Sequence, residues 1–140
     1  MARLIFWCAR CDVPLSSALE RVDDLSVVGE EDAQPLIPHG RYMLSAALLD
    51  AGHTWSGLTR DEIIVNLRDV INIQPGGTRN GCCGVDGLDG INTFCVNGHP
   101  IGTEKSDCWM PHFMHIPLAV CRREDCRARF SPCERAKARP

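Results

Sequence analysis

Short apolar runs separated by polar and turn-forming residues make up most of the chain. Residues 3–7 and 62–65 are rich in aromatic and β-branched side chains, a composition typical of short strands. Residues 41–45 also have strand character, but the stretch 42–49 fits the start of a helix equally well. Further extended segments are expected at 91–95, 100–103 and 109–120. The pattern predicts a mostly β fold, with a small α+β fold as the alternative.

Prolines and glycines mark the loops between these runs. Two prolines exclude regular helix at 34–40, and Asn66 is placed to cap a short helical turn. The stretch 75–90 holds six glycines, and such a loop is too flexible to keep one shape unless other contacts tie it down. Cys82 and Cys83 lie in the middle of this loop.

The size and composition of the chain indicate one globular domain. Of its 140 residues, 44% are hydrophobic and 24% are charged, which is ordinary for a domain with an apolar core. The apolar stretch near the N-terminus is too short for a signal peptide, and no apolar run reaches the roughly 18 residues of a membrane span. We therefore expect a cytoplasmic protein that makes no contact with a membrane.

Nine cysteines are a high and odd count for a chain of this length. In a reducing compartment thiols remain free to bind metals, so the excess favours metal binding, with disulfides as the alternative. One thiol would stay unpaired even if the others formed disulfides.

Two short motifs carry the spacing of metal ligands. Cys8-x2-Cys11 can turn two thiolates toward one ion, and Cys95-x3-His99 can supply a thiolate and an imidazole. Gly98 permits the positive φ that lets the second motif wrap around the ion. Together the four side chains predict one closed, tetrahedral Zn²⁺ site, which would tie distant parts of the chain together and contribute its binding free energy to folding.

Both motifs resemble known zinc-binding sequences. Residues 6–15 look like the Cys-x2-Cys-Gly-x-Pro-Leu knuckle of zinc-ribbon modules, and residues 95–100 look like their Cys-Pro-Asn-Gly-His knuckle. In this chain Asp12 stands where glycine is usual, and the knuckles are about 80 residues apart instead of adjacent. The resemblance implies a zinc-ribbon-like protein whose ligands are Cys8, Cys11, Cys95 and His99.

A second group of candidate ligands is Cys82, Cys83, Cys108 and His112. A second metal site, a reactive thiol and buried inert cysteines are the three alternatives for it. A thiol of this group with His112 and Asp86 would have the residue types of a cysteine nucleophile, its base and an orienting carboxylate. The glycine-rich run 80–92, continuing to 106–109, is similar to small bacterial proteins known only as uncharacterised, and this likeness implies no activity.

Charge divides the chain into two parts. Residues 121–140 carry seven basic and three acidic side chains, a net charge of +4, whereas residues 1–120 carry −7. We therefore expect a zinc-stapled domain at 1–120 followed by a basic, less ordered tail at 121–140. Such a tail can contact nucleic acid, but a solvated tail, or one that folds back on the acidic domain, is the favoured interpretation.

Three classes of function follow from these features. The chain has no phosphate-binding loop, nucleotide fingerprint or metallohydrolase motif, and we assign no catalytic residue. A Zn²⁺ ion with four protein ligands has no open position for chemistry, which favours a non-enzymatic protein-interaction or adaptor module that binds another protein. The alternatives are a thiol- or metal-dependent enzyme that uses Cys82, Cys83 or Cys108 with His112, and a nucleic-acid-binding module that uses residues 121–140.

Overall fold

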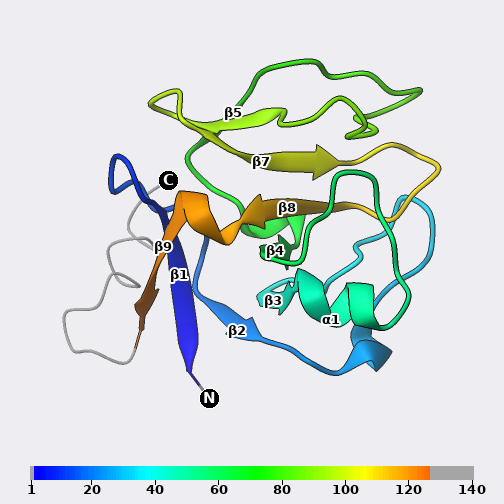
Figure 1. Ribbon diagram of the computed structural model, residues 1–140, viewed down its shortest axis with the longest axis horizontal. Helices are drawn as coiled ribbons and strands as arrows, with labels where there is room; N and C mark the ends of the chain where they lie inside the picture. The colour runs from blue at the N-terminus through cyan, green and yellow to red at the C-terminus, as the bar shows by residue number, and fades with distance from the viewer. Residues whose placement is uncertain (1, 127–140) are drawn as a thin grey trace.

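The structure is a computed structural model that describes residues 2–126. Its nine strands among these residues form one curled sheet in the order β5-β6-β7-β8-β4-β3-β2-β1-β9 (Figure 1). The strands are β1 (Arg3–Cys8), β2 (Leu19–Arg21), β3 (Arg41–Leu44), β4 (Glu62–Val65), β5 (Ile73–Pro75), β6 (Thr93–Cys95), β7 (Pro100–Lys105), β8 (Phe113–Pro117) and β9 (Cys121–Asp125). All neighbouring pairs are antiparallel except β2 and β3, which run parallel. The prediction of a mostly β fold is confirmed.

The few helices in the described residues are short. They are α1 (Ser45–Asp50) and the 3₁₀ turns η1 (Leu25–Val27), η2 (Leu67–Asp69) and η3 (Leu118–Val120). The two alternatives for residues 41–49 both occur, because β3 ends at Leu44 and α1 begins at the next residue. Asn66 caps η2 as predicted, since its side-chain oxygen accepts a hydrogen bond from the Arg68 amide at 2.8 Å. No helix within residues 2–126 is long and apolar enough to cross a membrane.

Both faces of the sheet are apolar in its centre. All four residues of β4 are buried, and they alternate between two clusters of side chains. Ile63 and Val65 pack in the first cluster, and Ile64 packs in the second, which α1 covers with Leu48 (Figure 1). The first cluster also contains Phe6, Leu19, Tyr42, Met114 and Ile116, and the second also contains Val22, Leu36, Ile37, Met43 and Phe113. A continuous apolar run in β4 is explained by this burial on both faces.

The sheet curls so that β1 and β6, which are far apart in the strand order, approach each other at one end. Asn72, at the entry to β5, connects them: its side chain donates to the Pro14 carbonyl at 2.8 Å, and its carbonyl accepts from the Val96 amide at 3.0 Å. Cys8, Leu15, Cys95 and Ile101 then form one buried cluster. The curl therefore brings the predicted ligands of β1 and β6 together.

The loop between β5 and β6 is held by contacts with the end of β7 and the segment that follows it. The buried Lys105 ammonium donates to the Gly87 carbonyl at 3.0 Å, and Cys83 forms a disulfide with Cys108. The sequence analysis required that a loop so rich in glycine be held by other contacts, and these two contacts hold it.

The sheet extends beyond the predicted end of the domain at residue 120. Residues 121–125 form β9, which pairs with all but the first residue of β1. These five residues were expected to belong to the less ordered tail, but they pair with β1 as the edge strand of the sheet. Residues 127–140, which make up most of the predicted basic tail, lie outside the described residues, and the division of the chain into domain and tail stays a prediction.

Candidate metal centre

The first knuckle is a tight return at the end of β1. The Cys8 amide donates to the Val13 carbonyl at 2.8 Å, and the Asp12 amide donates to the Cys8 carbonyl at 3.1 Å. Asp12 takes a left-handed conformation with φ of 55°. Aspartate tolerates this region better than most residues, which explains how Asp12 can stand where zinc-ribbon knuckles usually have glycine.

The second knuckle joins β6 to β7. The Cys95 amide donates to the His99 carbonyl at 2.9 Å, and the Gly98 amide donates to the Cys95 carbonyl at 2.8 Å. Gly98 has φ of 87°, as expected from the sequence. The turn places the Cys95 thiol and the His99 ring on the same side, so each knuckle presents two ligands.

The four predicted ligand side chains lie together. Their ligand atoms, the three Sγ atoms and one imidazole nitrogen, are all within 4.8 Å of one another. Cys11 Sγ lies 3.7 Å from Cys95 Sγ, and His99 Nδ1 lies 3.3 Å from Cys95 Sγ and 3.7 Å from Cys8 Sγ. The group can hold a metal ion, and the Nδ1 atom faces the sulfurs.

The two thiols of the first knuckle have different electrostatic surroundings. Burial is the main influence on Cys8 and raises the pKa of its thiol. Burial also acts to raise the pKa of Cys11, but hydrogen bonds from Asn97 and from the neighbouring thiols outweigh it, so the pKa of Cys11 lies below its ordinary value. A bound cation would favour the thiolate form at both positions, since thiolates are the metal-binding species.

A fifth cysteine lies beside this group without belonging to it. Cys121 pairs with Cys8 in the register of β9 and β1, but its thiol donates to the carbonyls of Pro117 and Leu118 instead of facing the other sulfurs. Burial raises the pKa of Cys121 to about 11. Its thiol is directed at these carbonyls, so Cys121 is not one of the four candidate ligands.

The second predicted cluster is assembled only in part. Cys82, Cys83 and Cys108 have their sulfur atoms within 4.8 Å of one another, with Cys83 and Cys108 joined in a disulfide and Cys82 free and exposed. His112 is not part of the group, because its Nε2 atom lies 2.9 Å from the Asp107 carbonyl oxygen. The sequence analysis included His112 on spacing alone, and the backbone between Cys108 and His112 carries the ring elsewhere.

Asp107 organises the surroundings of this cluster. Its carboxylate accepts hydrogen bonds from the amides of Cys82, Cys83 and Cys108 and from the indole of Trp109. The backbone hydrogen bonds, those of Cys83 and Cys82 first, hold the pKa of Asp107 far below its ordinary value. The Asp107 carboxylate thus fixes both sides of the disulfide and the exposed Trp109 ring.

Sequence reasoning missed a buried hydrogen-bonded pair elsewhere in the sheet. Glu62 opens β4 and His115 lies inside β8, and the two are in contact although both belong to apolar runs. A signal was present, since a charged residue at the edge of an otherwise apolar strand needs a partner when it is buried. The partner itself could not be chosen, because it depends on the pairing of β4 with β8.

Comparison of the chain with protein-family models, curated proteins and solved structures finds no match.

Proposed function

We propose that this protein binds one structural Zn²⁺ ion through Cys8, Cys11, Cys95 and His99. The observation that carries the proposal is the separation of the ligand atoms. Zinc–sulfur bonds of about 2.3 Å and zinc–nitrogen bonds of about 2.05 Å at tetrahedral angles require about 3.8 Å between sulfurs and about 3.6 Å between sulfur and nitrogen. The observed separations support this geometry: 3.7 Å between the sulfurs of Cys11 and Cys95, and 3.3 and 3.7 Å from His99 Nδ1 to the sulfurs of Cys95 and Cys8.

The donor set supports zinc over harder cations. Three thiolates and one imidazole suit Zn²⁺, whereas Ca²⁺ and Mg²⁺ take oxygen ligands. With four protein ligands the coordination sphere is complete, so the ion acts as a structural staple between β1 and β6 instead of activating water.

A variant series tests this proposal directly. Cys8→Ser and Cys95→Ser each remove one ligand from a different knuckle, and Cys121→Ser removes a neighbouring thiol that is outside the group. If the proposal holds, the first two variants lose zinc and fold poorly, while Cys121→Ser retains both zinc and fold. Equal zinc content in the unsubstituted protein and in all three variants would refute the assignment of the ligands.

We further propose that the zinc-stapled domain is a non-enzymatic interaction module for another protein. Trp109 supports this role, because the residue is 52% exposed while its indole nitrogen is held 2.7 Å from the Asp107 carboxylate. An aromatic ring that is both exposed and already ordered can bind a partner at a low entropic cost, and tryptophan is enriched at binding hot spots. The ring borders a cavity of about 270 Å³ that is also lined by Trp55, Glu30 and Asp32, which suits an apolar or basic side chain of the partner.

Trp109→Ala tests the interaction role, with Leu25→Ala as the matched control. Both positions are exposed hydrophobic residues, but Leu25 does not line this cavity. Crosslinked complexes of the full chain isolated from its source cells should lose a specific partner in Trp109→Ala and keep it in Leu25→Ala. If both variants gave the same crosslinked complexes, a role for the surface around Trp109 would be contradicted.

The two alternative functions have less support. A cysteine nucleophile needs an imidazole beside it, and His112 is occupied with the Asp107 carbonyl. The nucleic-acid alternative depends on a tail that lies mostly outside the described residues and stays a prediction.

A further inference from the structure

Glu62 and His115 form a buried pair whose chemistry the zinc site does not use. His115 Nδ1 lies 2.8 Å from Glu62 Oε1, and both side chains are only 4% exposed. The other carboxylate oxygen of Glu62 accepts hydrogen bonds from the amide and hydroxyl of Thr59 at 2.6 and 3.2 Å. Burial acts to raise the pKa of Glu62, but the hydrogen bonds from His115 and Thr59 outweigh it, so the carboxylate is ionised. His115 Nδ1 must then carry the hydrogen that it donates.

This arrangement leaves the second ring nitrogen of His115 without a partner. Nε2 is buried and has no hydrogen-bond partner among residues 2–126. A buried polar atom of this kind is uncommon and costly in folded proteins unless water or a ligand satisfies it. Because Glu62 fixes the ring orientation, Nε2 is held in one direction and is available to a bound molecule.

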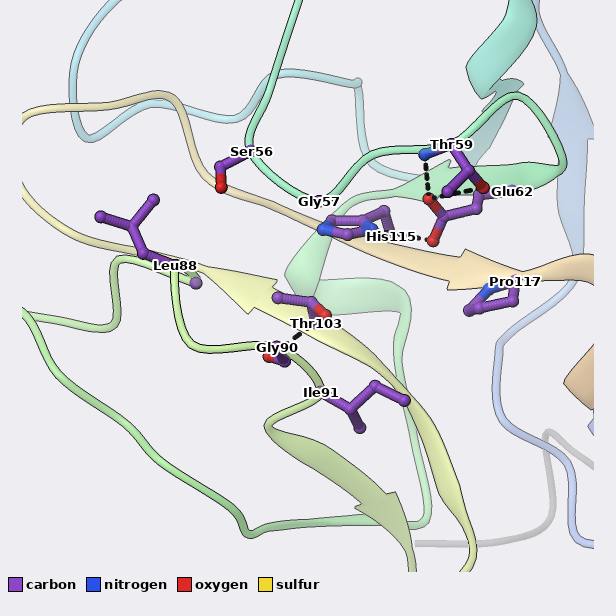
Figure 2. A pocket seen from close by; sticks show the side chains of 11 residues that line it. Ser56, Gly57, Thr59, Glu62, Leu88, Gly90, Ile91, Thr103, His115 and Pro117 are labelled. Atoms are coloured by element: carbon purple, nitrogen blue, oxygen red, sulfur yellow. Dashed lines mark hydrogen bonds and ion pairs between the residues drawn. The ribbon is translucent and has the colours of Figure 1, made fainter.

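Nε2 points into a cavity. Figure 2 shows the imidazole with one edge toward Glu62 and the opposite edge toward the space between Ser56 and Leu88. The cavity measures about 200 Å³, and Gly90 and Ile91 form its far wall. Leu88 and Ile91 are both partly exposed, so the cavity opens to solvent through an apolar rim.

The size and lining of the cavity limit what can bind there. An apolar protein cavity of about 150 Å³ holds benzene, so about 200 Å³ admits one ring with a small substituent. A hydroxyl group suits Nε2, because it can donate a hydrogen bond to the lone pair of the neutral ring. We propose that this cavity binds a small uncharged molecule with a hydroxyl on a compact apolar body, which hydrogen-bonds to His115 Nε2.

Phenol is the appropriate probe, and anisole is its control, since anisole has the same ring but cannot donate a hydrogen bond. Titration of the full-length, zinc-loaded protein, followed by the ¹⁵N resonances of the His115 ring, should give saturable phenol binding with a shift of Nε2. Anisole should bind at least about fivefold more weakly, because it leaves a buried acceptor unsatisfied.

Two exposed leucines provide matched variants that leave the Glu62–His115 hydrogen bond intact. Leu88 lines the cavity and Leu25 does not, although 53% and 43% of their surfaces are exposed. Leu88→Trp should obstruct the cavity and weaken phenol binding at least about tenfold, and Leu25→Trp should leave it unchanged. His115→Phe should remove the preference for phenol over anisole if the variant folds.

Three results of these titrations would overturn the proposal. The absence of saturable phenol binding would exclude the site. Equal affinity for phenol and anisole would show an apolar cavity in which His115 plays no part. Phenol binding that persists in Leu88→Trp would place the ligand elsewhere on the protein.

Discussion

Cys11 and Cys95 are separated by 84 positions in the sequence, and their Sγ atoms lie 3.7 Å apart. The contact joins the loop after β1 to the end of β6, two strands with five others between them in the sheet. Neither knuckle alone supplies more than two ligands, so the proposed ion needs the folded chain to bring both knuckles together and would in turn stabilise that fold. This coupling predicts that metal binding and folding are lost together.

The first prediction concerns ligand removal. Cys95→Ser should abolish the cooperative thermal transition or lower the free energy of unfolding by several kcal/mol, since structural zinc sites contribute on the order of 10 kcal/mol to folding. A chelator should have the same effect on the unsubstituted protein. Circular dichroism on heating measures both, with Cys121→Ser as the control. An unchanged transition in Cys95→Ser would show that the fold does not need this ligand.

The second prediction concerns pH. The pKa of Glu62 is lowered in the folded protein, so its ionised form adds stability above the unfolded-state pKa of about 4.3. This stability is lost as the pH falls through the folded-state pKa. The difference in unfolding free energy between the unsubstituted protein and Glu62→Gln should therefore shrink as the pH falls below about 5.

Denaturant unfolding at a series of pH values provides this comparison. Both proteins carry the same candidate metal ligands, so acid release of a metal cancels in the difference. A difference that stays constant down to pH 3 would contradict the assigned role of the Glu62 carboxylate.

The third prediction concerns thiol reactivity. Cys82 is free and exposed, whereas burial raises the pKa of Cys121 to about 11. An alkylating reagent at neutral pH should modify Cys82 first and Cys121 at least about a hundredfold more slowly, because the thiolate is the reactive species. Mass spectrometry of digested protein at timed intervals gives the order. The thiols of the zinc site should react only after a chelator is added, and their early modification without one would argue against a bound ion.

The fourth prediction concerns the glycine-rich loop. Cys108→Ser opens the disulfide with Cys83, which closes a segment of 25 residues and is worth about 3 kcal/mol in the chain-entropy description. Limited proteolysis should then cut the loop between β5 and β6 faster than in the unsubstituted protein. Cys82→Ser is the control, since Cys82 is free, and equal cleavage rates in the two variants would show that the disulfide does not hold the loop.

Local features of the structure could be predicted from the sequence, and long-range ones could not. The strand at 62–65, the cap at Asn66 and the ligand pairs of the two knuckles each depend on neighbouring residues. The hydrogen bond between Glu62 and His115 depends on the register of β4 against β8, which no local pattern reveals. The grouping of His112 with Cys108 has the same weakness, because a spacing of four residues does not fix side-chain direction outside a helix.

The pairing of distant strands also explains why the sheet continues past residue 120, where the sequence analysis had placed the end of the domain. Residues 121–125 have a charged composition that suits a solvated segment, yet they form β9 because β1 offers a free edge. Tertiary context overrides local preference most readily at such an edge, where one side of the strand remains in solvent.

Metal analysis of the purified protein tests the central claim most directly. The protein is incubated with Zn²⁺, freed of excess metal by gel filtration and measured without reductant, so that the Cys83–Cys108 disulfide is retained. One equivalent of zinc per chain is predicted, falling to none in Cys95→Ser. Less than about half an equivalent after this loading, or one equivalent in both proteins, would contradict a structural zinc site at Cys8, Cys11, Cys95 and His99.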